Sequence, residues 1–174
     1  MNKELSDAFG QAKPSGKHPA ADSIEDVITF KLQLLVSIGE RAGQDWSQRL
    51  FDLSLNEWRM LALVRSRGPC RAGDISDLLH MDKSQTSRVM RVLLKRELIV
   101  SRPDPNDGRA LSLELTPAGE VLHDRVFREV MNSNERVLAT LTRDEVEAFY
   151  KTLKKLVTHS QDLLEIRLDR KVVR

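Results

Sequence analysis

A chain of 174 residues, of which 40% are hydrophobic and 31% are charged, is long enough to bury a core and has the composition of a soluble globular protein. No apolar stretch approaches the roughly 20 residues that a membrane span needs, so we expect no membrane partner and a cytoplasmic location. The only cysteine, Cys70, excludes an internal disulfide and a cysteine-based metal cluster within one chain. The four histidines lack zinc spacing, and no phosphate loop or nucleophile motif occurs, which argues against an enzyme, a metal site and a cofactor.

The net charge of +2 is unevenly distributed along the chain. Residues 65–109 hold 10 basic and 6 acidic residues, whereas residues 1–64 hold 7 and 9 and residues 110–174 hold 11 of each. A local charge of +4 is typical of a nucleic-acid footprint, but also of an ordinary solvated surface. The placement of the basic residues on the predicted elements has to decide between these two interpretations.

The first elements are an arm and a long helix. Residues 1–22 are polar and contain two glycines and two prolines, so we predict a disordered arm. Asp22 and Glu25 form a capping-box pattern that opens a helix over about 24–49. The apolar residues of this helix recur at helical spacing: Ile28, Leu32, Leu35, Ala42 and Trp46.

Three shorter helices are predicted next. Ser54 and Glu57 form a second capping box, and the helix that they open is stopped at residues 68–69, a Gly-Pro pair. Its predicted buried stripe consists of Trp58, Leu61 and Ala62. A helix over 71–80 is expected to bury Ile75, Leu78 and Leu79. A further capping pattern opens a helix over 82–97 whose inward side is predicted to hold Val89, Met90, Leu93 and Leu94.

The outer face of the helix over 82–97 is polar and without acidic residues. Five side chains recur there at steps of three and four, which places them on one face: Ser84, Ser87, Arg88, Arg91 and Lys95. Hydroxyls and cations on one helix face can bond to base edges and phosphates. The alternative is a set of solvated surface residues on an ordinary amphipathic helix.

The period then changes from helical to alternating. Residues 99–102 and 111–115 are predicted strands, with Leu111, Leu113 and Leu115 facing one way and Ser112 and Glu114 the other. Residues 103–108 are rich in Pro, Asn, Asp and Gly, so we expect a turn and a β-hairpin. Thr116 and Pro117 open a helix to about residue 140. A capping box at 142–145 opens a last amphipathic helix that continues almost to the C-terminus.

This order predicts a mainly α fold with a small β wing. A short helix, a tight turn and a basic-faced helix form a helix-turn-helix, and the hairpin attached to its end is a wing. We therefore predict a winged helix-turn-helix DNA-binding domain over 53–116, flanked by long dimerisation helices at 23–52 and 117–174. The predicted function is sequence-specific binding of double-stranded DNA.

From about residue 24 to residue 164 the sequence resembles the MarR family of transcriptional regulators. The resemblance rests on the run Asp107-Gly108-Arg109-Ala110, on the leucines at 111, 113 and 115, on Thr116 and Gly119, and on the flanking segments 55–61 and 82–98. In that family the wing arginine enters the minor groove and the aspartate beside it helps to hold it, which implies these roles for Arg109 and Asp107. The resemblance also implies a homodimer formed through the terminal helices and a small, often phenolic or aromatic anionic effector.

The predicted DNA-contacting residues are therefore Ser84, Gln85, Ser87, Arg88, Arg91, Lys95, Asp107 and Arg109. The side chain of Gln85 has an alternative role, which is to complete the helix cap. As an isolated hairpin residue, Arg109 would be read as a solvated turn residue, and the resemblance reverses that interpretation.

An effector site is predicted near Trp46, Arg49 and Trp58, because two indoles offer stacking area and a guanidinium can pair with a carboxylate. The competing interpretation places both tryptophans in the core and leaves Arg49 solvated. We thus expect a regulator, most commonly a repressor in this family, that binds a pseudo-palindromic operator as a dimer and is released by an aromatic or phenolic acid or its conjugate. The alternatives are a redox regulator switched at Cys70 and a ligand-independent architectural DNA-binding protein.

Overall fold

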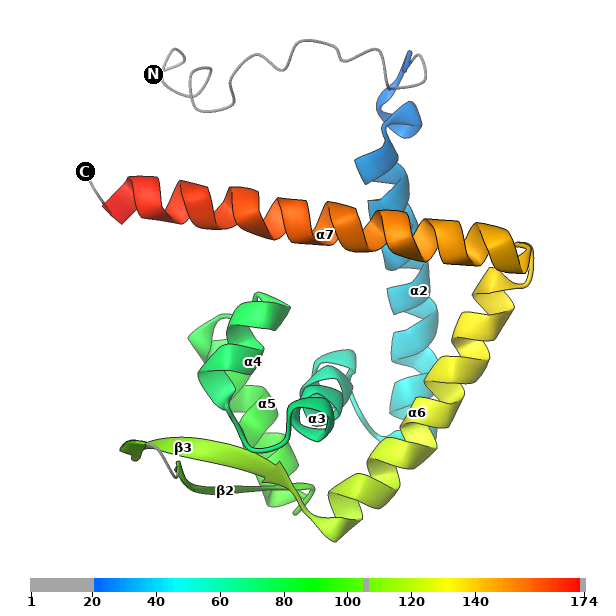
Figure 1. The fold of residues 1–174 in the computed structure, drawn as a ribbon. Helices are drawn as coiled ribbons and strands as arrows, with labels where there is room; N and C mark the ends of the chain where they lie inside the picture. Colours follow the sequence, from blue (N-terminus) through cyan, green and yellow to red (C-terminus); the bar gives the residue numbers. More distant parts are fainter. Residues whose placement is uncertain (1–20, 105–106, 173–174) are drawn as a thin grey trace. The chain divides into compact units, whose positions relative to one another are not determined.

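The computed structural model describes residues 21–104 and 107–172, without the side chains of 107–110 and 165–172. The fold is mainly helical with one small sheet, as predicted (Figure 1). The predicted arm over 1–22 lies outside the described residues except for its last two. The chain divides into two compact units, residues 1–122 and 123–174, and each is described by itself below.

The first unit begins with a 3₁₀ turn, η1 (Ile24–Asp26), and a long helix, α2 (Ile28–Phe51). The predicted continuous helix from residue 24 is wrong, because Val27 is extended between the two elements. The predicted capping pair is wrong by one residue. Ser23 donates both its N–H and its hydroxyl to the carboxylate of Asp26, each at 3.1 Å. This local pairing closes a separate turn before α2 starts.

Three helices follow: α3 (Leu55–Arg67), and then α4 (Ala72–Leu79) and α5 (Lys83–Lys95), which form the helix-turn-helix. The capping box predicted at the start of α3 is confirmed. The N–H of Glu57 donates to the Ser54 hydroxyl at 3.3 Å, and the N–H of Ser54 donates to the Glu57 carboxylate at 2.8 Å. A two-residue strand that was not predicted, β1 (Cys70–Arg71), lies between α3 and α4.

The core of this unit lies where the three helices meet the sheet. Its buried apolar side chains are Leu53, Trp58, Met60, Leu61, Val64, Ile75, Val89, Leu93, Leu98, Ile99 and Leu113. The predicted burial is wrong for two residues, because Leu78 on α4 is 39% exposed and Leu94 on α5 is 36% exposed. Each lies at the edge of its helix's apolar stripe.

The sheet has the order β1-β3-β2 and is antiparallel, with β2 at Ile99–Asp104 and β3 at Asp107–Leu115. The hairpin strands extend through most of the predicted turn, so the expected six-residue turn is too long. The strand runs regularly through residues 111–115 as predicted, but burial does not follow the alternation, because Leu111 is 58% exposed and Ser112 is buried. Ser112 lies directly between Arg71 of β1 and Arg102 of β2, and such cross-strand neighbours share one face of a sheet. The two long side chains therefore flank the small serine.

Helix α6 (Pro117–Leu138) starts in the first unit and continues into the second. Thr116 caps it as predicted, since its hydroxyl accepts from the N–H of Gly119 at 3.0 Å. The same hydroxyl donates to the carbonyl of Glu97 at 2.6 Å, and the N–H of Thr116 donates to the carbonyl of Leu98 at 3.1 Å. The first turn of α6 is thereby fixed to the end of the helix-turn-helix.

The second unit holds the rest of α6 and all of α7 (Arg143–Val172). The capping box predicted for α7 is confirmed: Thr142 and Glu145 exchange two hydrogen bonds between backbone N–H groups and side-chain oxygens, at 2.8 and 3.3 Å. The N–H and the hydroxyl of Thr142 both donate to the Glu145 carboxylate, at 2.8 and 3.0 Å, and these two bonds lower the pKa of that carboxyl. Among the described helices, none has the length and apolar character needed to cross a membrane.

Candidate nucleic-acid interface

The polar stripe predicted on the recognition helix α5 is exposed throughout. Its members are Ser84, Ser87, Arg88, Arg91 and Lys95. The opposite side of the helix carries Val89 and Leu93, which are buried in the core. Packing on one side therefore fixes which side chains α5 presents to solvent. This helix carries no acidic residue, so its outer face is suited to a polyanion.

The start of α5 is held by a capping box that uses one of the predicted DNA contacts. The N–H of Gln85 donates to the Asp82 carboxylate at 2.8 Å, and the side-chain oxygen of Gln85 accepts from the N–H of Asp82 at 3.1 Å. The structure thus places the Gln85 side chain in the cap, which was the alternative left open by the sequence. A role of Gln85 in DNA contact remains a proposal.

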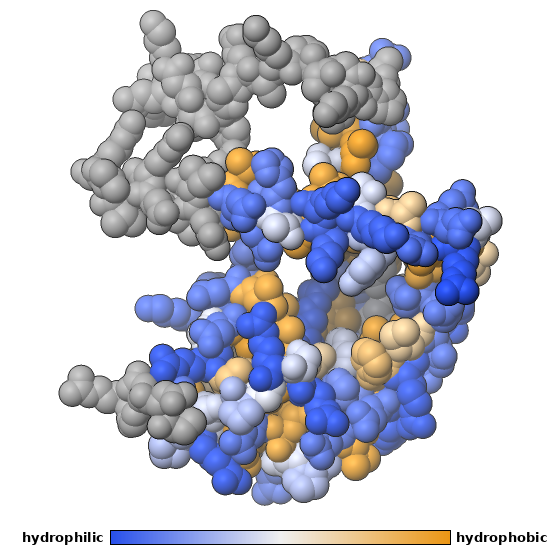
Figure 2. Space-filling view, in the orientation of Figure 1, coloured by the Kyte–Doolittle hydropathy of each residue, from blue (hydrophilic) through white to orange (hydrophobic). Residues whose placement is uncertain are grey.

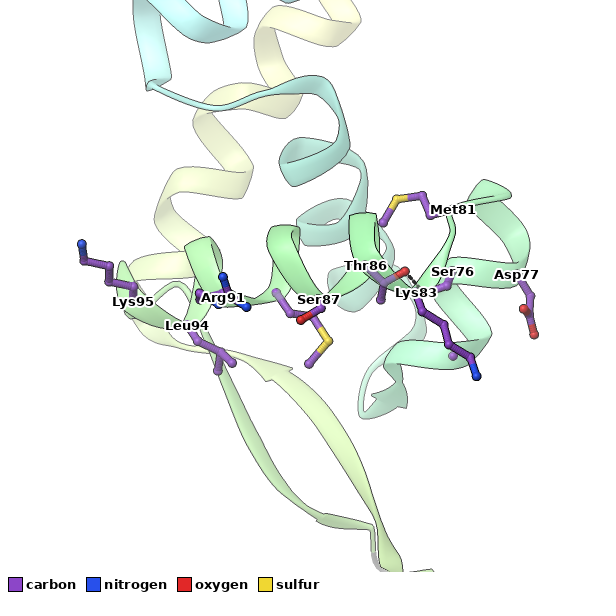
Figure 3. A pocket seen from close by; sticks show the side chains of 11 residues that line it. Ser76, Asp77, Met81, Lys83, Thr86, Ser87, Arg91, Leu94 and Lys95 are labelled. Carbon is purple, nitrogen blue, oxygen red and sulfur yellow. Dashed lines mark hydrogen bonds between the residues drawn. The ribbon is translucent and has the colours of Figure 1, made fainter.

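The turn between α4 and α5 is fixed by two buried hydroxyls. The side chains of Ser76 and Thr86 are hydrogen-bonded at 2.8 Å (Figure 3). The Ser76 hydroxyl also lies 2.7 Å from the Ala72 carbonyl oxygen, and the Thr86 hydroxyl 2.8 Å from the Asp82 carbonyl oxygen, so two hydroxyl protons are shared among three contacts. Sequence reasoning missed this pair, although a polar residue at an inward helix position is a usable signal. The bond fixes the recognition helix against α4, since a buried polar pair is costly to break.

The far end of α5 is held by Arg96. Its guanidinium donates to the carbonyl oxygens of Phe51 and Asp52, at 3.1 Å for Phe51, and these carbonyls lie at the C-terminal end of α2. Such carbonyls carry partial negative charge and lack helical partners, so a cation there is favourable. Both ends of the recognition helix are therefore anchored to other elements. No sequence motif indicated the contact, which spans more than 40 residues.

The wing is the β2–β3 hairpin. Asp107 and Arg109 belong to β3, but their side chains lie outside the described residues, so their predicted roles stay proposals. Near the tip of the wing, the Nε of Arg71 lies 2.9 Å from a carboxylate oxygen of Asp104. This ion pair, which was not predicted, links the start of α4 to the end of β2.

A groove of about 770 Å³ runs along α5 beside α4 (Figure 3). Four of its lining residues come from the polar side of α5: Lys83, Ser87, Arg91 and Lys95. Asp77 of α4 is the acidic residue among the lining side chains, and Figure 3 shows it at the opposite end from Arg91 and Lys95. The cation-rich end can take an anionic ligand such as a phosphate backbone.

The three predicted effector residues have different environments. Trp58 is buried in the core on α3, as the competing interpretation expected. Trp46 is half-buried and meets the ring of Phe51 edge-on, with ring centres 6.0 Å apart. The side chain of Arg49 is 70% exposed and forms an ion pair with Asp45 one turn earlier on α2. Trp46 and Arg49 thus lie together on the last turns of α2, whereas Trp58 is part of the hydrophobic core on α3.

Cys70 is half-buried at the start of β1. Burial raises the pKa of its thiol, and Asp74 adds to the rise, whereas Arg67 lowers it. A reactive sensor cysteine needs the opposite shift, since only the thiolate reacts readily with oxidants. The redox alternative therefore loses support at this residue.

Residues 51–110, which include the helix-turn-helix and most of the wing, match the MarR family. The chain is 26% identical over 107 residues to the multiple antibiotic resistance protein MarR of Salmonella typhimurium, covering 61% of this chain and 74% of the relative. It is 26% identical over 146 residues to the transcriptional repressor NicR of Pseudomonas putida, covering 83% of this chain and 92% of the relative.

Solved structures have the same fold. A MarR/EmrR family regulator from Acinetobacter sp. ADP1 superposes with a TM-score of 0.72 at 22% identity, over 80% of this chain and 99% of that one. The MepR–DNA complex of S. aureus gives 0.67 at 17% identity, over 79% and 99%. PcaV of Streptomyces coelicolor, solved with its natural ligand, gives 0.65 at 20% identity, over 82% and 99%. Residues 51–110 thus match the MarR family, and the chain shares the fold of these solved structures.

Proposed function

We propose that the chain is a cytoplasmic transcriptional repressor, and not an enzyme, that binds a pseudo-palindromic operator as a homodimer and is released by a small aromatic or phenolic acid or its conjugate. The observation that carries the DNA-binding part is the exposed, acid-free face of α5, positioned by the core beneath it. The relatives named MarR and NicR, and the fold shared with a DNA-bound MepR, support the same conclusion. We assign DNA binding to residues 53–116 and dimerisation to 23–52 and 117–174.

The DNA-binding proposal is tested with duplexes recovered by the wild-type protein from a random library. Arg91→Ala removes an exposed cation from the centre of the stripe. We expect weaker binding and a shallower dependence of affinity on salt, by a slope of about 1 if one phosphate contact is lost. Arg109→Ala should weaken binding in the same way while the melting temperature barely changes.

Arg41→Ala is the matched control, because Arg41 is an exposed arginine on α2 and lies away from the recognition helix. Its affinity for the same duplexes should equal that of the wild type. If Arg91→Ala and Arg109→Ala both bind like the wild type, the placement of the recognition helix and the wing is wrong. A footprint on a single unrepeated half-site would contradict the pseudo-palindrome, for which we expect half-sites about 10 base pairs apart.

The dimer proposal rests on apolar side chains that the chain leaves exposed. On α2 they are Ile28, Phe30, Leu34, Leu35, Val36 and Ile38, and Figure 2 shows hydrophobic side chains between hydrophilic ones near the start of this helix. On α7 they are Phe149, Tyr150, Leu156, Val157, Leu163 and Leu164. Exposed apolar side chains in such numbers are typical of subunit interfaces. Sedimentation should give a dimer at micromolar concentration, and a folded monomer there would refute the proposal.

The effector proposal places an aromatic acid at the last turns of α2, near Trp46, Arg49 and Trp58, and draws support from the fold shared with the ligand-bound PcaV. To bind the ligand carboxylate, Arg49 has to break its ion pair with Asp45. Because this ion pair is exposed, breaking it costs little free energy. We expect salicylate and related phenolic acids to quench tryptophan fluorescence and to release DNA over the same concentration range. DNA must then weaken acid binding by the same factor.

Arg49→Ala should lower the affinity for the acid and leave DNA affinity intact, with Arg41→Ala again as the control on the same helix. An acid that releases DNA equally from the wild type and from Arg49→Ala would refute the site while leaving DNA binding established. If none of the acids acts and hydrogen peroxide releases DNA instead, the redox alternative at Cys70 is correct. If neither acts, the architectural alternative is correct.

A further inference from the structure

The groove beside α5 contains a feature that phosphate binding does not explain. Met90 and Leu94 line it between the cations, one helical turn apart. Leu94 is 36% exposed and Met90 is half-buried, so neither is a closed part of the core. Figure 3 shows Leu94 projecting to the same side of α5 as Lys83 and Ser87. An apolar pair therefore lies along the border between the buried side and the polar side of the recognition helix.

We propose that Met90 and Leu94 are specificity-determining residues that contact thymine methyl groups in the major groove. This inference rests on the proposed DNA-binding function and adds the base that the groove selects. Thymine alone presents a methyl group on the floor of the major groove, and apolar side chains are the groups that favour it. Solvent-exposed apolar side chains between cations fit that partner, because DNA offers phosphates at the edges of the groove and methyl groups inside it.

The charges around the pair support duplex DNA as the occupant of the groove. Lys83, Arg91 and Lys95 line the same groove, and the acidic Asp77 lies on α4 at the far end. Cations on both sides of the pair hold it against a polyanion. A second copy of this chain, whose net charge is +2, offers no comparable density of negative charge.

The experiment replaces thymine by deoxyuridine, which lacks only the methyl group. Duplexes are first recovered from a random library with the full-length wild-type protein, and each thymine is then replaced singly. We expect affinity to fall about fourfold at one or two positions in each half-site, the value for losing one buried methyl group. All other positions should be unaffected.

Three variants connect the effect to the groove. In Met90→Ala and Leu94→Ala the ratio of affinities for the thymine and deoxyuridine duplexes should fall to about 1 at the position that each residue contacts. Leu94→Met keeps an apolar group and should retain the ratio. Leu78→Ala is the control, because Leu78 is similarly exposed, lies on α4 and does not line the groove. Its ratio should equal that of the wild type.

The ratio separates base contact from packing. A residue that only stabilises the fold changes both affinities equally and leaves the ratio alone. Wild-type protein that binds thymine and deoxyuridine duplexes equally at every position overturns the inference while the DNA-binding function stands. A sensitivity to deoxyuridine that persists in both alanine variants also overturns it. Wild-type protein that selects no duplex at all refutes the proposed function itself.

Discussion

Among the glycines whose surroundings the structure describes, Gly119 should tolerate a side chain least. It occupies the first turn of α6, where a Cβ would lie 2.0 Å from the carbonyl oxygen of Leu98 and 3.0 Å from the carbonyl carbon. Real Cβ atoms essentially never approach another heavy atom within 3.0 Å, so the two segments would have to separate by about 1 Å. The obstacle is backbone, which no change of a neighbouring side chain can remove.

The cost of Gly119→Ala follows from the contacts at that point. Separating the segments strains the hydrogen bonds from Thr116 to the carbonyls of Glu97 and Leu98. Overpacking costs about 1–3 kcal/mol and a lost hydrogen bond about 1 kcal/mol, so the free energy of unfolding should fall by about 2–4 kcal/mol. For a chain of this length the melting temperature should fall by about 5–15 °C.

Thermal unfolding followed by circular dichroism at one fixed protein concentration measures the effect. Gly73→Ala is the matched control, because Gly73 also lies in the first turn of a helix and an added Cβ there meets no heavy atom within 4 Å. Its melting temperature should stay unchanged or rise, since alanine is the better helix former. A Gly119→Ala protein that melts within 1 °C of the wild type would refute the close approach of α6 to Leu98.

Three further predictions follow from local geometry. Thr86→Val removes the buried bond to Ser76 and should lower the free energy of unfolding by about 1–3 kcal/mol in chemical denaturation, whereas an unchanged midpoint would contradict the pairing. Alkylation of Cys70 by iodoacetamide should have its midpoint at a pH above that of an ordinary thiol, and a midpoint below it would restore the redox reading. The Glu145 carboxyl should titrate by NMR below the ordinary glutamate pKa. Because the pKa of this carboxyl is lower in the folded state, the stabilisation by the capping box is complete above the unfolded-state pKa and is lost as the pH falls through the folded-state pKa. If the carboxyl titrates identically in Thr142→Val and in the wild type, the Thr142 hydroxyl does not contribute to the lowered pKa.

The features that were predictable from sequence are those whose partners are close in the chain. The capping boxes at Ser54, Asp82 and Thr142 each join residues three apart, and all three are confirmed. The one error of this kind, at Asp22, arose because two overlapping patterns compete within residues 22–26. The periodicity of α5 likewise depends on the helix alone, so its exposed stripe was placed correctly.

The features that were missed depend on partners far away in the chain. Strand β1 has only two residues and exists because β3 pairs with it, so residues 70–71 carry no strand signal of their own. The ion pair between Arg71 and Asp104 spans 33 residues, and the contacts of Arg96 with the end of α2 span 44 and 45. The sequence around a charged residue does not show which residue it pairs with, or how far away in the chain that partner lies.

The contacts of Arg96 also bear on how an effector could act at all. Ligand and DNA affect each other only through an element whose position both of them change. The last turns of α2 carry Trp46 and Arg49, and the same helix end supplies the carbonyls that bind the guanidinium at the end of α5. A ligand that moves the end of α2 therefore moves the hydrogen-bond acceptors of the recognition helix, without a relay through other side chains. Under the proposed effector site, the factor by which an aromatic acid and DNA weaken each other's binding therefore includes a contribution from this junction.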